Sequence, residues 1–259
     1  MSKIANAFKD GKAFIAFLTG GDPTPEKTVE YILTMEKAGA DLIEIGIPFS
    51  DPTAEGVVIQ DANIRALKAG TTTDKIFEIV KEVRKTSQIP LVFLTYLNPV
   101  FHYGYDAFFK KCKEYQVDGL IIPDLPYEEK HEVTDVADLY GVDIISMIAP
   151  TSKQRIQMIA SEAKGFIYIV SSMGVTGVRS EITTDIPGIV EAIRQVSDVP
   201  AAVGFGISTP AQAEEMAKAS DGAIVGSAIV KIIAAKKDQA AQDLYDYVRS
   251  MKEAVQKAD

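Results

Sequence analysis

Short apolar runs recur along this chain of 259 residues, and longer stretches with a different periodicity separate them. We count eight such runs, at residues 14–18, 42–45, 91–94, 120–122, 144–148, 166–170, 201–203 and 223–225. Most of them lack alternation with polar residues, which is typical of strands that are buried on both faces in a parallel sheet. The chain is therefore predicted to place eight buried strands between other elements.

Between these runs the apolar residues follow a helical period. Four stripes have helical spacing, and they comprise Ile76, Ile79, Val80 and Val83; Val133, Val136, Ala137 and Tyr140; Ile189, Ala192, Ile193 and Val196; and Leu244, Val248, Met251 and Val255. Each stripe would put one apolar face of a helix against the sheet. Gly39 and Gly141 are predicted to end helices, whereas Thr24-Pro25 and Thr209-Pro210 are predicted to begin them.

Eight strand–helix units within about 250 residues predict an α/β fold, a (β/α)₈ TIM barrel. The alternative is a doubly wound open sheet. Because no linker rich in Ser and Gly divides the chain, we expect a single barrel domain over residues 1–259. The interval between residues 45 and 91 is the longest, and it predicts an inserted loop or an extra helix.

Composition excludes several classes of function. Hydrophobic residues make up 47% of the chain and charged residues 24%, which is ordinary for a globular protein. A net charge of −9 argues against nucleic acid or an anionic membrane as a partner. One cysteine and two histidines argue against a zinc site, so no metal is expected. We interpret residues 9–19 as a buried first strand and not as a signal peptide, and we expect a cytoplasmic protein.

In a barrel of this kind the chemistry lies at the C-terminal ends of the strands and in the loops that follow them. The ionisable candidates in such positions are Asp22, Glu44, Asp51, Glu55, Asp124 and Arg179. His102 and His131 do not lie at strand ends, and no Ser or Cys nucleophile accompanies them, which argues against a hydrolase triad. No lysine ends a strand, which argues against a Schiff-base aldolase.

Glu44 is the least expected residue, because it interrupts the apolar run 42–45. Alternation along a strand puts Leu42 and Glu44 on the same face. If that face is the barrel interior, burial would raise the pKa of Glu44 and suit it to proton transfer near neutral pH. The alternative is a structural Glu paired with an internal Lys or Arg. Glu55 would by itself be a surface charge, but it follows closely enough for two carboxylates to address one substrate.

Glycines gather after three successive strands. They lie in residues 174–177, 204–206 and 226–228. Barrels often hold phosphate with the loops after their last two strands and the N-terminus of a short helix, and glycine lets the backbone approach closely. These segments therefore predict a phosphate site. Residues 171–187 are polar and rich in Gly, Ser and Thr, and we interpret them as a lid that closes over substrate.

Taken together, these segments resemble the alpha subunit family of tryptophan synthase nearly from end to end. The resemblance rests on residues 17–23, 44–52, 122–126, 174–177, 204–208 and 226–230, of which 44–52 is the most specific. It implies retro-aldol cleavage of indole-3-glycerol phosphate to indole and glyceraldehyde 3-phosphate, without a metal or organic cofactor. It also implies a beta subunit partner in an alpha2beta2 heterotetramer, whose pyridoxal phosphate consumes the indole.

The resemblance also implies roles for particular residues. Glu44 would be the acid–base glutamate, acting on the glycerol hydroxyl and on indole C3. Glu55 stands where the family usually has an aspartate that holds the indole N–H, and Val57 stands where it commonly has proline. The remaining implied contacts are Phe17, Leu94 and Phe205 with indole; Tyr168 and Thr176 flanking the substrate; Gly177, Gly206, Gly226 and Ser227 with phosphate; and Asp51, Asn98 and Pro126 facing the beta subunit.

Three other interpretations stay open at this point. The chain could be another phosphosugar-binding barrel, such as an isomerase or epimerase, with the same phosphate cluster and other acids. It could be a free-standing lyase that releases indole. It could also be a subunit without activity that only activates a partner, an interpretation that the glutamate at position 55 alone supports.

Overall fold

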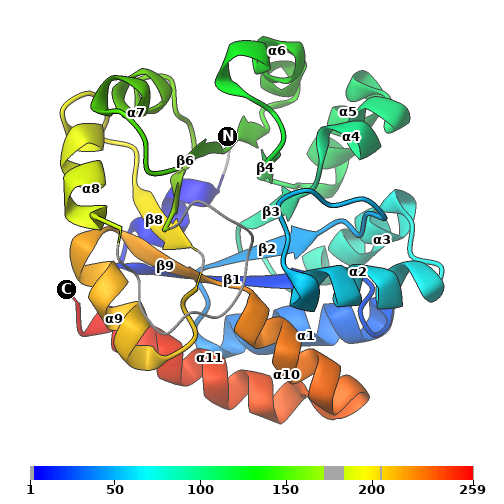
Figure 1. The fold of residues 1–259 in the computed structure, drawn as a ribbon. Helices are drawn as coiled ribbons and strands as arrows, with labels where there is room; N and C mark the ends of the chain where they lie inside the picture. The colour runs from blue at the N-terminus through cyan, green and yellow to red at the C-terminus, as the bar shows by residue number, and fades with distance from the viewer. Residues whose placement is uncertain (1–2, 172–183, 205, 259) are drawn as a thin grey trace.

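The computed structural model describes residues 3–171, 184–204 and 206–258 (Figure 1). In these residues nine strands form one sheet in the order β5-β4-β3-β2-β1-β9-β8-β7-β6, and every pair is parallel. The strands are β1 (Ala13–Thr19), β2 (Leu42–Gly46), β3 (Leu91–Leu94), β4 (Gly119–Ile121), β5 (Asp143–Ile144), β6 (Ser146–Ile148), β7 (Ile167–Val170), β8 (Ala201–Gly204) and β9 (Gly222–Val225).

Helices follow the strands and surround the sheet (Figure 1). The α-helices are α1 (Pro25–Ala38), α2 (Val57–Lys68), α3 (Thr73–Arg84), α4 (Leu97–Tyr103), α5 (Tyr105–Tyr115), α6 (His131–Tyr140), α7 (Lys153–Ala160), α8 (Ile186–Arg194), α9 (Pro210–Ala219), α10 (Ser227–Lys236) and α11 (Ala241–Gln256). Three short 3₁₀ helices complete the set, η1 (Ile4–Phe8), η2 (Tyr127–Glu129) and η3 (Lys237–Gln239).

The two ends of the strand order come from the same stretch of chain, and this closes the ring. The predicted run 144–148 is broken at Ile145, so that β5 pairs with β4 and β6 pairs with β7. The prediction of one continuous strand there was wrong, because the chain shifts partners between two neighbours within five residues. The TIM barrel is confirmed and the doubly wound open sheet is wrong, since an open sheet would end on two unrelated strands.

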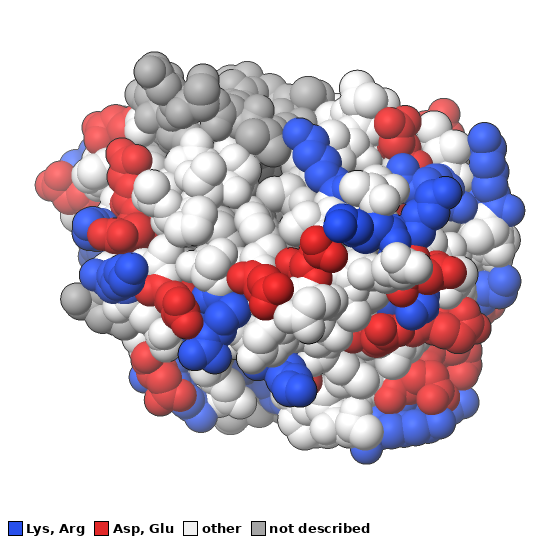
Figure 2. Space-filling model, turned by 90° about the horizontal axis from the view of Figure 1, so that it is seen from below, with Lys and Arg blue, Asp and Glu red and all other residues white. Residues whose placement is uncertain are grey.

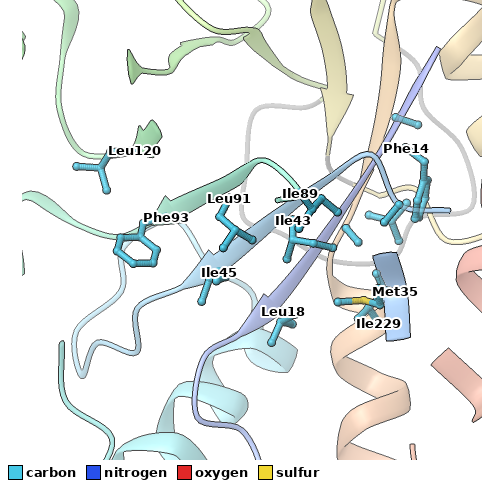
Figure 3. Close-up of a cluster of buried hydrophobic side chains, with 14 of the residues drawn as sticks. Phe14, Leu18, Met35, Ile43, Ile45, Ile89, Leu91, Phe93, Leu120 and Ile229 are labelled. Carbon is cyan, nitrogen blue, oxygen red and sulfur yellow. The ribbon is translucent and has the colours of Figure 1, made fainter. Parts of the chain in front are cut away.

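Alternation along the strands separates two apolar clusters. Ile15, Leu42 and Val92 belong to a cluster inside the barrel, together with residues of β4, β7, β8 and β9. The neighbours of these residues in sequence face outward and pack against the helices. Figure 3 shows part of that outer layer, in which Ile43 and Leu91 lie on the helix side of the sheet. The face that Glu44 shares with Leu42 is therefore the barrel interior.

Local signals set most helix boundaries as predicted. Gly39 and Gly141 end α1 and α6 in the left-handed region, with φ of 109° and 71°. Thr24 accepts a hydrogen bond from the Lys27 N–H at the start of α1, and Thr209 forms a capping box with Gln212. The long interval after β2 holds α2 as an extra helix before α3, as expected. Val196 lies beyond the end of α8 and is exposed, so its assignment to that stripe was wrong.

A short N-terminal helix and an ion pair close the end of the barrel at which the strands begin. The side chain of Ile4 in η1 is fully buried among the interior residues. Asp118 accepts hydrogen bonds from the backbone N–H groups of Lys3 and Leu91, and from the Arg84 guanidinium at 3.2 Å. Burial lowers the pKa of Arg84, and the charge of Asp118 opposes that shift. The contacts at this end of the barrel therefore stabilise the fold. The opposite end, where the strands terminate, is where barrels of this kind place their functional residues.

The surface is mixed in charge where it can be seen. Figure 2 shows acidic and basic side chains interspersed on the face that bears α10 and α11, without a continuous basic patch among the described residues of that face. No helix in the described part of the chain is long and apolar enough to cross a membrane. Residues 13–19 form the fully buried strand β1, which agrees with the interpretation of this segment as a strand.

Candidate active site

Glu44 lies on β2 with its side chain in the barrel interior and only 1% of its surface exposed. Its Oε1 atom has no hydrogen-bond partner among the described residues. Burial raises the pKa of Glu44 to about 8, because the charged form loses its hydration there. The alternative of a structural Glu paired with an internal cation is not supported, since no described Lys or Arg forms an ion pair with it. A carboxyl group with such a pKa can both give and take a proton near neutral pH.

Glu55 lies in the loop between β2 and α2 and is 6% exposed, so it is not a surface charge. Asn63 of α2 donates a hydrogen bond from Nδ2 to Glu55 Oε2 at 2.7 Å. Gln60 of the same helix donates from Nε2 to the backbone oxygen of Glu55, also at 2.7 Å. Burial raises the pKa of Glu55 to about 7, and the hydrogen bond from Asn63 opposes that shift.

Both carboxylates line one pocket at the C-terminal ends of the strands. Its walls are Phe17, Glu44, Ala54, Glu55, Ile59, Leu94, Tyr96, Pro123, Met147, Tyr168, Gly206, Ile207, Ile224, Gly226 and Ser227. Most of these side chains are apolar, and no Lys, Arg or His is present among the described lining residues. The structure thus brings together the described residues that the sequence suggested for catalysis, indole and phosphate.

Tyr168 of β7 reaches the pocket because the neighbouring strand leaves room for it. A Cβ atom at Gly204 of β8 would lie 2.3 Å from the Tyr168 hydroxyl oxygen, which is too close for any side chain. Burial raises the pKa of Tyr168, and the nearby charge of Glu44 adds to the effect. Gly204 therefore serves to admit a tyrosine, while Gly206, with φ of +84°, adopts a conformation that other residues rarely reach.

The described glycine segments meet at the start of α10. Gly226 is the N-cap of α10 and Ser227 its first residue, and no side chain caps this N-terminus. The first N–H groups of a helix have no partner within it and point outward along the axis. Gly206, Gly226 and Ser227 line the same pocket. The geometry offers backbone donors to an anion in a pocket that also holds the carboxyl groups of Glu44 and Glu55.

Several predicted residues have other positions. Asp22 is buried in an ion pair with Arg65, and Asp124 accepts a hydrogen bond from the backbone N–H of Leu97, so both serve structure. Asp51 is exposed in the loop after β2. The remaining predictions lie outside the described residues, namely Thr176, Gly177, Arg179, Phe205 and all of the proposed lid except residues 171 and 184–187.

The comparisons with known proteins agree with this geometry. The family model for the tryptophan synthase alpha chain matches residues 4–256. The tryptophan synthase alpha chain of Lacticaseibacillus casei is 51% identical over 98% of this chain and 96% of that protein. The crystal structure of the alpha chain from Legionella pneumophila superposes with a TM-score of 0.89 at 35% identity, covering 99% of this chain and 98% of that one.

This chain belongs to the tryptophan synthase alpha chain family. It is a carbon–carbon lyase of tryptophan biosynthesis, and its reaction is the retro-aldol cleavage of indole-3-glycerol phosphate. The alpha subunit in the tryptophan synthase a2b2 complex of Pyrococcus furiosus also shares the fold, with a TM-score of 0.83 at 34% identity over 93% of this chain and 98% of that one.

In this member of the tryptophan synthase alpha chain family, the structure places two further residues at the pocket that sequence reasoning missed. Tyr96 is fully buried after β3, lines the pocket and accepts a hydrogen bond from the Ala54 N–H at 3.0 Å. Asn63 lies eight residues after Glu55, on the next helix. A buried Asn inside the apolar stripe of α2 was the available signal for Asn63. Nothing local pointed to Tyr96, because its partner is 42 residues away.

A larger groove lies beside the pocket and shares only Pro123 and Met147 with it. It has a cavity volume of about 680 Å³, against about 50 Å³ for the pocket, and residues of α6, β6 and α7 line it. Its charges are paired across the groove, as Arg155 with Glu128, Lys130 with Glu162, and Lys164 with Asp138. Size alone would favour the groove, whereas the unpartnered buried carboxyl group makes the pocket the candidate site.

Proposed function

We propose that the alpha reaction takes place in the pocket that Glu44 and Glu55 line. The observation that carries this proposal is Glu44, a buried carboxyl group with a free oxygen and a pKa near 8. Retro-aldol cleavage needs one proton removed from the glycerol hydroxyl next to the breaking bond and one proton added to indole C3. Glu44 takes the first and supplies the second, so that the C–C bond breaks and an aldehyde forms as indole is released.

Glu55 holds the substrate through the indole N–H in this proposal. Its carboxylate stabilises the positive charge that develops on the indole ring when C3 gains a proton, and a pocket without bulk water strengthens that attraction. Phe17 and Leu94 supply apolar surface for the ring, and both line the pocket. Tyr168 flanks the substrate from β7.

The phosphate group is proposed to bind at the N-terminus of α10, at the backbone N–H groups near Gly226 and Ser227, with Gly206 beside them. An uncapped helix start is suited to an anion because its donors are free and its dipole is favourable. Anchoring the phosphate lets binding energy orient the bond that breaks. Gly177, Thr176 and Phe205 keep their proposed contacts on the strength of the resemblance alone. None of these steps draws on a metal or an organic cofactor.

The partner is proposed to be the tryptophan synthase beta subunit, which would carry pyridoxal phosphate, in an alpha2beta2 assembly like that of Pyrococcus furiosus. Asp51, Asn98 and Pro126 are exposed in regions that follow β2, β3 and β4, on the same rim as the pocket. Val57 and Phe101, nearby in sequence, are apolar yet 69% and 68% exposed. Exposed apolar side chains on the segments that follow these strands favour a protein partner. Co-elution with the beta subunit tests this, and no association would contradict it.

Replacing Glu44 tests the proposed chemistry. We expect E44Q to lower kcat for indole release by about 10²–10⁴, because the amide cannot exchange the proton. The measurement is indole release from indole-3-glycerol phosphate, with and without the beta subunit. E82Q, on the exposed side of α3, is the matched control and should retain full turnover.

Near-normal turnover in E44Q would overturn the role given to Glu44. A wild-type chain that binds the beta subunit but releases no indole would instead favour the interpretation that this chain is inactive and only activates its partner. Indole release with no affinity for a beta subunit would favour a free-standing lyase. Turnover of another phosphosugar without indole release would favour an isomerase or epimerase.

A further inference from the structure

Asn63 makes the hydrogen bond that fixes the side chain of Glu55. It lies on α2, is 3% exposed, and donates from Nδ2 to Glu55 Oε2 at 2.7 Å. Among the described residues it is the one side chain that donates to this carboxylate. The Asn63 amide N–H needs only one acceptor, which is Oε2. The other carboxylate oxygen, Oε1, can therefore accept a hydrogen bond from a ligand.

The helix that carries Asn63 is itself held rigidly at the barrel rim. Arg65 of α2 donates from Nε and Nη2 to the two carboxylate oxygens of buried Asp22, at 2.9 and 2.7 Å. Ile59 and Ala62 of α2 pack in a buried cluster with Phe17 of β1 and Val230 of α10. The amide of Asn63 is therefore presented to Glu55 in one place, which is what a positioning residue requires.

The hydrogen bond from Asn63 matters because the side chain of Glu55 is long. A glutamate has one more rotatable bond than an aspartate, so its carboxylate reaches further and holds its position less firmly. A buried amide bonded to Oε2 removes that freedom. Glu55 lines the same pocket as Glu44, and the bond from Asn63 occupies Oε2, so that Oε1 has no side-chain donor among the described residues.

We propose that Asn63 is the positioning residue of the alpha reaction, holding Oε2 of Glu55 so that Oε1 accepts the indole N–H. The proposal rests on the proposed role of Glu55. In this proposal the uncharged side chain of Asn63 both orients the Glu55 carboxylate and lowers the pKa of Glu55.

The surroundings of Glu55 make the ionisation sensitive to this bond. The titratable groups that line the pocket with it are Glu44 from β2, Tyr96 after β3 and Tyr168 from β7. None of them is a cation. Donation from the Asn63 amide favours the charged form of Glu55 and lowers its pKa, against the effect of burial. Removing the amide therefore raises the pKa, and activity that needs the carboxylate is lost at a higher pH.

The test compares N63A with Q60A in the full chain bound to its beta subunit. Q60A removes a hydrogen bond from the same helix to the same residue, but to the backbone oxygen and not to the carboxylate. We expect N63A to lower kcat/KM for indole-3-glycerol phosphate by about 10–100-fold, as for loss of a bond to a charged group. In the pH profile of kcat/KM, the acid limb is the range in which activity falls as the pH decreases. In N63A this limb should move to higher pH by about 0.5–1 pH unit, whereas in Q60A it should stay where it is in the wild type.

A length exchange provides the rescue. E55D shortens the acid by one methylene and N63Q lengthens the amide by one, so each single variant breaks the bond and the pair restores its span. We expect the double variant to recover at least about tenfold in kcat/KM over either single variant. If N63A does not fold, N63D replaces it, because it keeps the size of the side chain and should move the acid limb in the same direction.

An acid limb that stays in place in N63A, or in N63D, would overturn the proposal and leave Asn63 a structural residue. A double variant that does not exceed both of its single-variant parents would also overturn it. Absence of indole release by the wild-type chain would instead overturn the proposed function, so the two failures are distinguishable.

Discussion

Glu44, the residue proposed to carry the chemistry, is buried at a cost to the stability of the fold. Glu44 has no partner for Oε1 and is buried among apolar side chains, so its charged form is poorly solvated. Its pKa is about 8 in the folded chain and 4.5 in a flexible one. Between these two values the folded state binds more protons than the unfolded state, so stability falls as the pH rises from about 5 to 8.

Replacing this carboxyl group should therefore stabilise the fold. At pH 8 we expect E44Q to raise the free energy of unfolding by about 2–4 kcal/mol, because the amide never needs to be charged. At pH 5 the gain should nearly vanish, since Glu44 is then protonated in the folded state. Urea unfolding of both proteins at the two pH values measures this. A gain that does not depend on pH would contradict the burial of an ionisable Glu44.

At the scale of elements, the turn between α10 and α11 contains a strained residue. Lys237 has φ of 47° and ψ of −122°, a conformation that suits glycine and is costly for a residue with a Cβ atom. Its backbone oxygen accepts a hydrogen bond from the hydroxyl group of buried Tyr31, which ties the turn to α1. The turn keeps this shape because the tertiary contact requires it.

Glycine at this position should relieve the strain. We expect K237G to raise the free energy of unfolding by about 1 kcal/mol, even though glycine gains freedom in the unfolded chain. K236G is the matched control, because Lys236 ends α10 with a negative φ, and glycine there should cost about 1 kcal/mol. Thermal unfolding of the two variants decides the matter, and a lower midpoint for K237G would show that the turn is not strained.

At the scale of the whole molecule, the described strands that complete the ring between α6 and α7 are short. The large groove lies there, and exposed ion pairs such as Arg155–Glu128 cross it. The strand beneath is the one that breaks into β5 and β6, of two and three residues. The opposite side has β1 and β2, which are longer and fully buried.

Amide hydrogen exchange should therefore begin in the region of β5, β6 and the groove between α6 and α7. We expect amides of α6 and β5 to exchange well before those of β1 and β2, because short strands and exposed ion pairs open at a lower free energy. Mass spectrometry of labelled peptides would give the order. Equal protection across all strands would show that the ring is closed as firmly here as elsewhere.

Local sequence determined the strands, most helix ends and the face on which Glu44 lies, because periodicity and capping depend on residues a few positions apart. It also carried the family resemblance, which the match over residues 4–256 confirms. Only the tertiary structure decided that Glu44 lacks a partner, that Asp22 pairs with Arg65, and that Asn63 holds Glu55. The break at Ile145 was decided there too. Desolvation, hydrogen bonding and strand pairing depend on which distant segments meet, and no local pattern records that.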